Sequence, residues 1–218
     1  MSINPDAKTN MDSMYRWTRH VYDASRKYFL LGRDQLIDRL APKPGQHICE
    51  VGCGTARNLI KMAKRHKDMH FYGLDVSDEM LKTARNSMKY AGLQNRVKLA
   101  QGYAETFDPQ AVFDLEAPLD KIVFSYSLSI IPPWQDSIDH ALALLPAGGE
   151  IHIVDFGDMK DHPQWFKKLI FWWLDLFHVY HKPEILEYLQ NLVTEGKGTL
   201  NIHKLYNSYA YLAVFKKV

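Results

Sequence analysis

The segment EVGCGTARN, residues 50–58, decides the fold. It ends a short β-prone run, HICEV (47–51), and its glycines Gly52 and Gly54 allow a tight turn and close approach of the backbone to a ligand. The next residues, Arg57 to Arg65, have the apolar spacing of a helix, whose N-terminus would point toward that ligand. A strand, a glycine turn and a helix thus form the first unit of the predicted domain.

Strands and helices alternate outward from this unit. Further strands are predicted at 70–76, 97–102, 121–128 and 150–156, and helices at 78–90 and 134–145, the first of them capped by Ser77. Alternation of this kind implies parallel strands in a three-layer α/β sandwich. The end of the chain departs from the pattern, with an aromatic helical segment, a helix near 183–192, and the runs TLNIHKLY and YAYLAVFKK as an antiparallel edge hairpin.

Composition and length limit the class of protein. The 218 residues suit one compact domain, and we predict an N-terminal helical cap (1–40) followed by a main domain (41–218). A formal net charge of +2 gives no indication of nucleic-acid binding, and two cysteines cannot form a disulfide framework. Without a secretory signal or a long apolar run, the expected location is the cytoplasm.

A glycine turn after one strand and a carboxylate at the end of the next strand fit two classes of cofactor. The carboxylate is Asp75 here, and it could accept hydrogen bonds from both hydroxyl groups of a ribose. The dinucleotide pattern G-x-G-x-x-G would need glycine at position 57, where the chain has Arg57. An arginine there would obstruct close packing of helix on strand, which disfavours a nicotinamide-dependent dehydrogenase. An ordinary solvated strand end is the structural alternative for Glu50 and Asp75.

The E-V-G-C-G-T-A run resembles the (E/D)-x-G-x-G-x-G motif of class I S-adenosylmethionine-dependent methyltransferases, departing at Ala56. The segments GLDVSDEML (73–81) and PAGGEIHIVDF (146–156) are similar to later motifs of that family. The resemblance implies a Rossmann-like sandwich and S-adenosyl-L-methionine as cofactor. It implies a cofactor site made of Tyr15, Arg33, Glu50, Gly52, Cys53, Gly54, Asp75, Val76, Met80, Gly102, Tyr103, Ala104 and Ser125. Tyr103 replaces the aspartate that the family uses to contact adenine, so the backbone N–H of Ala104 would have to serve.

A narrower resemblance concerns the methyl acceptor. The run MYRWTRHVYDASRKYFLLGRDQLI (14–37) and the run FSYSLSIIPPW (124–134) look like segments of the betaine-lipid N-methyltransferases, which trimethylate the amine of diacylglyceryl homoserine. The N-P-P-Y tetrapeptide of nucleic-acid methyltransferases is absent. The resemblance implies an amine-bearing lipid as substrate; a soluble small-molecule amine remains the alternative, as does a cofactor-binding module without catalysis.

Candidate residues for the acceptor side follow the fourth and fifth strands, because open α/β sheets bind ligands at the carboxyl ends of their strands. Tyr22, Tyr126 and Asp155 are the predicted catalytic residues: tyrosine faces hold a methylated ammonium, and the carboxylate orients the amine. Tyr126, Ser127 and His178 are the predicted substrate contacts. Core packing is the alternative for the tyrosines, a strand-end cap for Asp155, and a surface role for His178.

The stretch WFKKLIFWWLDLF, residues 165–177, is too short and too charged to span a bilayer. Tryptophan, phenylalanine and leucine beside lysine suit a helix in the lipid headgroup zone, and a lid or a dimer contact is the alternative. His178 and His181 lack the acidic or cysteine partners typical of zinc sites, so we predict no metal.

Overall fold

A computed structural model describes residues 29–175 and 181–218 of the chain. The predicted site residues Tyr15, Tyr22 and His178 lie outside the described residues, as do the last two residues of the aromatic stretch. The described residues contain every other residue predicted for the cofactor and acceptor sites.

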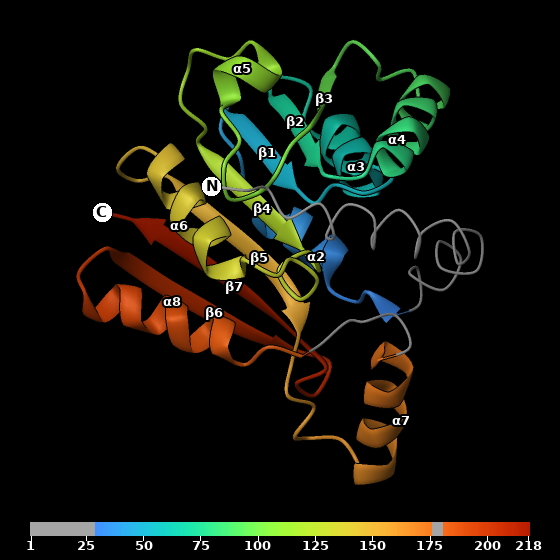
Figure 1. Cartoon of the computed structure of the whole chain (residues 1–218), viewed down its shortest axis with the longest axis vertical. Helices are drawn as coiled ribbons and strands as arrows, with labels where there is room; N and C mark the ends of the chain where they lie inside the picture. Colours follow the sequence, from blue (N-terminus) through green and yellow to red (C-terminus); the bar gives the residue numbers. More distant parts are fainter. Residues whose placement is uncertain (1–28, 176–180) are drawn as a thin grey trace.

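One seven-stranded sheet organises the described chain, in the order β3-β2-β1-β4-β5-β7-β6 (Figure 1). The strands are β1 (His47–Val51), β2 (His70–Asp75), β3 (Val97–Gln101), β4 (Lys121–Ser125), β5 (Glu150–Phe156), β6 (Gly198–Leu205) and β7 (Ala210–Lys217). The first five are parallel, whereas β7 is antiparallel to β5 and to β6. The predicted mostly parallel sandwich with an antiparallel edge hairpin is therefore confirmed.

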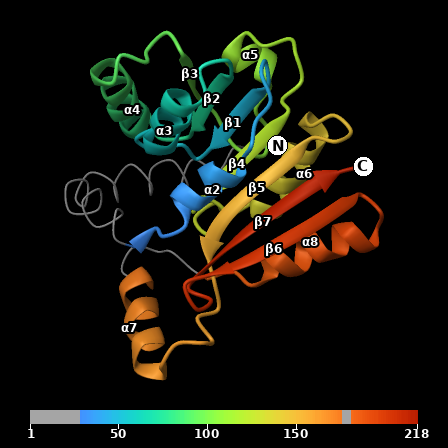
Figure 2. The same cartoon turned by 180° about the vertical axis from the view of Figure 1, so that it is seen from behind.

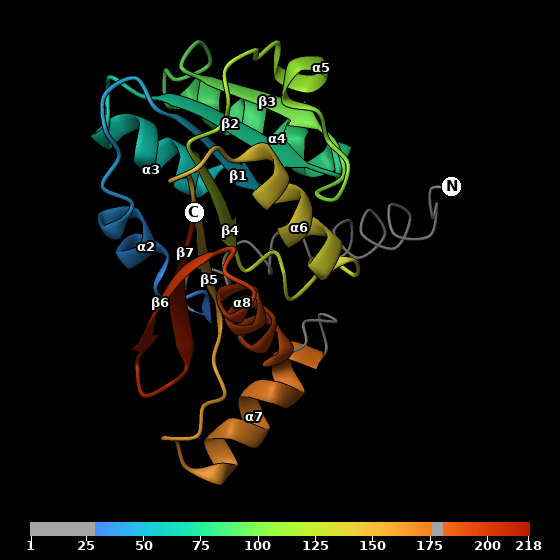
Figure 3. The same ribbon diagram turned by 90° about the vertical axis from the view of Figure 1, so that its left-hand side faces the viewer.

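Helices cover both faces of this sheet. They are α2 (Arg33–Arg39), α3 (Arg57–Arg65), α4 (Asp78–Tyr90), α5 (Pro109–Phe113), α6 (Trp134–Leu144), α7 (Gln164–Asp175) and α8 (Glu184–Thr194). Apolar residues of α2, α3, α4 and α7 share one core cluster, and those of α5, α6 and α8 share the other. Figure 3 shows α2 and α3 on one side of the central strands and α6 and α8 on the other.

The local sequence accounts for most element ends. Ser77 caps α4 through its hydroxyl, which accepts from the N–H of Met80 (3.4 Å). The strand predicted at 121–128 ends earlier, at Ser125, because Tyr126 takes a left-handed backbone conformation (φ 57°) that a strand cannot continue. Helix α5 was not predicted, although Asp108 caps it and Pro109 occupies its first position.

The part of the predicted cap that is described, from residue 29 to residue 40, packs into the main core. Gly32 precedes α2 with φ 85°, a left-handed conformation that glycine adopts without strain. Leu36, Ile37 and Leu40 are then fully buried in the same cluster as the inner faces of α3 and α4. The boundary between cap and domain at residue 40 stays a prediction.

Helix α7 stands beyond the carboxyl end of β5, apart from the layer of α6 and α8 (Figures 1 and 2). It packs inward through Ile170 and Leu174, both buried. Within the described residues, no helix has the length and apolar character needed to cross a bilayer.

Candidate active site

The glycine turn after β1 is held against the end of β2. The N–H groups of Gly52 and Cys53 both donate to the carbonyl oxygen of Leu74, at 2.8 and 3.0 Å. Gly52, Gly54 and Ala56 all have positive φ, at 74°, 54° and 64°. The turn thus uses the left-handed region three times in five residues, which glycine adopts freely and alanine at a cost. A tight turn was the sequence prediction, and the structure has it.

Asp75 closes the turn from the neighbouring strand. Its carboxylate accepts from the N–H of Gly54 (2.8 Å) with one oxygen and from the N–H of Ser77 (2.9 Å) with the other. The residue is 7% exposed. One carboxylate therefore fixes both the glycine turn and the start of α4, and its oxygens can accept further hydrogen bonds, because a carboxylate offers about four acceptor positions.

Glu50 and Ser125, both predicted cofactor residues, are linked by a residue that the sequence analysis did not select. The side-chain amide of Asn58, on α3, donates to Glu50 Oε1 (2.7 Å) and to Ser125 Oγ (3.0 Å). All three side chains are buried at the carboxyl ends of β1 and β4. A signal for Asn58 was present in the sequence, because it ends the segment that decides the fold and is the second residue of the helix that follows the glycines.

The loop after β4 presses directly on the glycine turn. A Cβ placed on Gly52 would lie 2.5 Å from the Cβ of Ser127, so no larger residue fits there. The Ser127 hydroxyl donates to the carbonyl oxygen of Val51 (2.9 Å). In this structure Ser127 therefore joins the loop after β4 to the turn after β1, and its predicted contact with substrate stays a prediction.

Four other predicted cofactor residues follow the ends of β2 and β3. The carbonyl oxygen of Val76 accepts from the side-chain amide of Gln101 (2.9 Å), and Gly102 donates its N–H to Asp75 O (3.1 Å). Tyr103 is half-buried and Ala104 is buried directly after that contact.

Two further predicted cofactor residues are buried beside the glycine turn. Burial raises the pKa of the Cys53 thiol well above its usual range, so the thiol stays protonated. The Met80 side chain is buried at the start of α4.

Tyr126 and Arg33 lie where the chain before α2 meets β4. The Tyr126 hydroxyl donates to the carbonyl oxygen of Leu31 (2.5 Å), and Arg33 Nε donates to that of Leu30 (3.1 Å). Burial raises the pKa of Tyr126 well above its usual range. These contacts match the core-packing alternative for Tyr126, and the catalytic role proposed for it stays a prediction.

Asp155 is a fully buried carboxyl group near the end of β5. It accepts from the backbone N–H groups of Phe156 (2.8 Å) and Ser129 (3.1 Å), so it fastens the loop after β4. Burial raises its pKa to about 6, against the hydrogen bonds and the nearby Lys182 ammonium, which lower it. These bonds match the strand-end alternative, while the raised pKa gives a carboxyl group that changes charge near neutral pH.

The half-buried Lys182 and the buried Tyr211 lie near Asp155, and neither was predicted. Lys182 Nζ donates to the carbonyl oxygens of Leu128 and Ile131, each at 3.0 Å, and so holds the same loop. Tyr211 is the cross-strand partner of Asp155, and among the described residues its buried hydroxyl has no hydrogen-bond partner. Their meeting depends on the pairing of β5 with β7, which no local sequence pattern marks.

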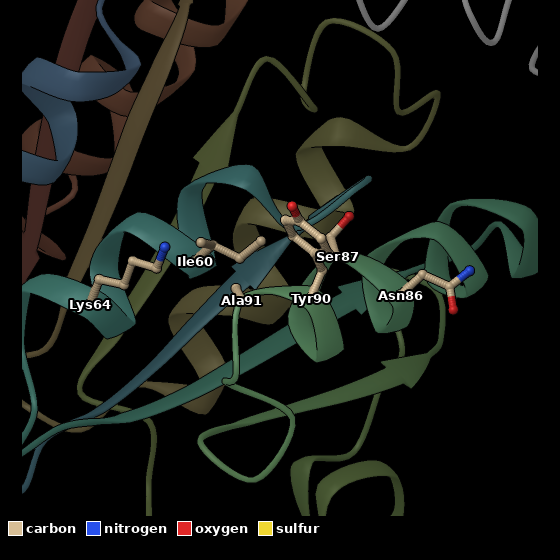
Figure 4. A pocket seen from close by; sticks show the side chains of 6 residues that line it. All are labelled: Ile60, Lys64, Asn86, Ser87, Tyr90 and Ala91. Carbon is tan, nitrogen blue, oxygen red and sulfur yellow. The ribbon is translucent and has the colours of Figure 1, made fainter.

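A separate surface hollow of about 640 Å³ lies between α3 and α4 (Figure 4). It is lined by Ile60, Lys64, Asn86, Ser87, Tyr90 and Ala91. Apart from Ile60, in the first turn of α3, they come from the carboxyl-terminal halves of the two helices and the residue after α4, and none of them belongs to the site described above.

The arrangement of the fold defines the class of protein. A parallel sheet with an antiparallel edge pair, a glycine turn after its first strand and a carboxylate after its second form the class I methyltransferase fold. A solved O-methyltransferase family 2 protein from Planctomyces limnophilus, in complex with apigenin, has this fold. It superposes with a TM-score of 0.69 at 20% identity, over 95% of this chain and 62% of its own.

Residues 42–201 match the family model of a methyltransferase domain, and the chain belongs to that family. It is 35% identical over 117 residues to YdaC, an uncharacterised methyltransferase of Bacillus subtilis, covering 54% of this chain and 60% of the relative. It is 25% identical over 131 residues to the ubiquinone/menaquinone biosynthesis C-methyltransferase UbiE of Cereibacter sphaeroides, covering 60% and 50%. The chain thus matches between half and two thirds of the length of these relatives.

The class I fold implies use of S-adenosyl-L-methionine, and the residues present fit it. Gly52 and Gly54 add no side chains to the turn, and the buried acceptors Glu50, near the end of β1, and Asp75, at the end of β2, flank it in the sheet order. Carboxylates suit a ligand that carries a sulfonium, an ammonium and two ribose hydroxyl groups. Arg57, at the position where a dinucleotide site needs glycine, instead reaches out to Asp34 on α2 (2.8 Å).

Proposed function

We propose that this chain is an S-adenosylmethionine-dependent methyltransferase whose cofactor lies over the carboxyl ends of β1 and β2. The observation that carries the proposal is the Asp75 carboxylate, which accepts hydrogen bonds from the N–H of Gly54 in the glycine turn and from the N–H of Ser77, the N-cap of α4. When bound, the cofactor supplies a methyl group on a sulfonium. The residues of the chain position the two reactants and exclude water, which is most of what such a displacement needs from a protein.

The acceptor that we propose is an amine, in particular the amine of a lipid-linked homoserine that becomes a trimethylated betaine. The similarity of residues 124–134 to betaine-lipid N-methyltransferases supports this, together with a buried carboxyl group, Asp155, on the neighbouring strand. An amine must be neutral to attack, and a carboxylate near it can orient it and take up its proton. Relatives of this chain include enzymes named as O- and C-methyltransferases, so oxygen and carbon acceptors are tested alongside.

The cofactor site is tested by the Asp75→Asn variant. Loss of charge-assisted hydrogen bonds should weaken S-adenosylmethionine binding by about 1.5–3 kcal/mol. Isothermal titration calorimetry measures this, with Asp78→Asn, an exposed carboxylate of the first turn of α4, as the matched control. If Asp75→Asn binds the cofactor as the unchanged chain does, Asp75 does not hold the ribose.

The acceptor is tested by mass spectrometry of products, after the chain is given labelled methyl donor and a panel of amine lipids, soluble amines, phenols and quinols. We expect label on the amine of the homoserine lipid. Label only on a soluble amine, an oxygen or a carbon would contradict the proposed acceptor, while it would support the proposed methyltransferase activity. Cofactor binding without any labelled product would favour a binding module.

A further inference from the structure

Helix α7 presents a line of large apolar side chains outward. Trp165, Leu169 and Trp172 are 68%, 50% and 60% exposed. Their spacing of four and then three residues places them on one face of the helix. Such a face departs from the usual surface helix, whose outer side is polar.

The opposite face of α7 already has its partners. Ile170 and Leu174 are buried in the core cluster, and the Trp173 ring stacks on the Phe29 ring with centroids 3.8 Å apart. Because these contacts fix the helix on the body of the protein, the outward residues are not needed for its attachment. Figure 1 shows α7 at one end of the molecule, apart from the other described helices.

The exposed area is small for a protein partner. Taking about 250 Å² for a whole tryptophan side chain, the exposed parts of these three residues amount to about 400 Å². A specific protein interface covers about 800 Å² on each partner. The outward face of α7 is therefore about half of what a stable dimer of this chain would need.

The chemistry of the face suits a lipid headgroup zone. Tryptophan concentrates at the boundary between hydrocarbon and water, where its ring is buried and its N–H stays hydrated. Lys168 is exposed between the two tryptophans, and Lys167 lies over the Phe171 ring, 5.5 Å from its centroid. Two lysines in the middle of the helix, with Asp175 only at its end, complement an anionic surface.

We propose that the outward face of α7, formed by Trp165, Lys168, Leu169 and Trp172, docks the protein on an anionic lipid bilayer. Helix α7 follows β5, so docking brings the carboxyl ends of the parallel strands toward the headgroups. The docking itself is independent of catalysis; its purpose, delivery of a lipid-borne amine to that edge, rests on the function proposed above.

Vesicle co-sedimentation of the full chain tests the docking. The probes are vesicles of phosphatidylcholine alone and of phosphatidylcholine mixed with phosphatidylglycerol. We expect binding to the mixed vesicles and roughly tenfold weaker binding for Trp165→Ser/Trp172→Ser, since affinity scales with the apolar area inserted. Tyr90→Ser is the matched control, because Tyr90 is 98% exposed on α4 and should not contribute. Lys167→Gln/Lys168→Gln should lose the preference for phosphatidylglycerol.

Three results would overturn the proposal. The first is that the unchanged chain binds neither kind of vesicle. The second is that the double tryptophan variant binds as well as Tyr90→Ser. The third is that the unchanged chain and Tyr90→Ser are dimers, whereas the double tryptophan variant is a monomer. Circular dichroism of each variant establishes that it is folded. Asp75→Asn separates the two proposals, because it should weaken cofactor binding and leave vesicle binding unchanged.

Discussion

Among single residues, Asp155 combines complete burial with a charge that changes near neutral pH. Its pKa is raised from 3.8 to about 6, chiefly by burial. Between these two values the folded chain keeps a proton that the unfolded chain loses. The free energy of unfolding therefore falls as pH rises through this window. Glu150, at the start of the same strand, has its pKa lowered to about 2 by its hydrogen bond to His152 and by Lys121. Its titration therefore changes the free energy of unfolding only at lower pH.

Replacing Asp155 by asparagine should remove that dependence on pH. We expect the unchanged chain to lose about 2 kcal/mol of unfolding free energy between pH 4.5 and 7, and Asp155→Asn to lose much less over that range. Urea unfolding at a series of pH values measures both.

The same variant separates the two roles considered for Asp155. If the carboxylate orients the amine, turnover of the unchanged chain rises with an apparent pKa near 6, and the variant loses this rise while its cofactor affinity is kept. An unaltered pH profile in the variant would leave Asp155 as the residue that fastens the loop after β4.

At the scale of elements, the contact between α3 and β2 depends on Gly73. A Cβ there would lie 2.5 Å from Leu59 Cδ1 on α3, 2.7 Å from Leu99 Cδ2 on β3 and 3.0 Å from Cys53 Sγ in the glycine turn. Because α3 begins directly after that turn, any movement of the helix also moves the cofactor site.

Gly73→Ala should therefore affect both stability and cofactor binding. We expect a loss of about 1–3 kcal/mol in unfolding free energy from overpacking, with weaker S-adenosylmethionine binding. Gly92→Ala is the control, because nothing lies within 4 Å of its added Cβ and only its φ of 69° is strained. That control should lose stability and keep its cofactor affinity. Thermal unfolding and calorimetry measure the two effects, and equal cofactor affinity in both variants would contradict the expected link between α3 and the turn.

The elements that the sequence predicts well are those with strong local signals. Residues 47–51 form the predicted strand exactly where glycine stops the apolar run, and Ser77 marks the start of α4. Local patterns gave a wrong prediction where the backbone adopts an uncommon conformation. The run at residues 121–128 predicts one strand, but the strand ends before Tyr126, whose φ is positive. The same limit applies to the site, because Glu50 and Asp75 follow from motif and position, whereas the meeting of Lys182 with the loop after β4 requires the packed sheet.

Over the whole molecule, two core clusters lie on opposite faces of one continuous sheet. Residues of β1, β4 and β5 contribute to both, through alternate side chains such as Ile48 on one face and Cys49 on the other. The part of the sheet that carries the cofactor site, β3-β2-β1 (the cofactor edge), and the hairpin β7-β6 (the hairpin edge) are therefore joined through β4 and β5.

Damage at the hairpin edge should consequently destabilise the cofactor edge. Phe215, on β7, is fully buried, and Phe215→Ala should cost about 3–5 kcal/mol of unfolding free energy. If the sheet unfolds as one unit, the slowest-exchanging amides of β2 lose protection by the same amount as those of β7. Hydrogen exchange read by mass spectrometry compares the two strands, with Lys216→Ala, an exposed neighbour on β7, as control. Protection of β2 that stays unchanged in Phe215→Ala would mean that the cofactor edge holds together without the hairpin.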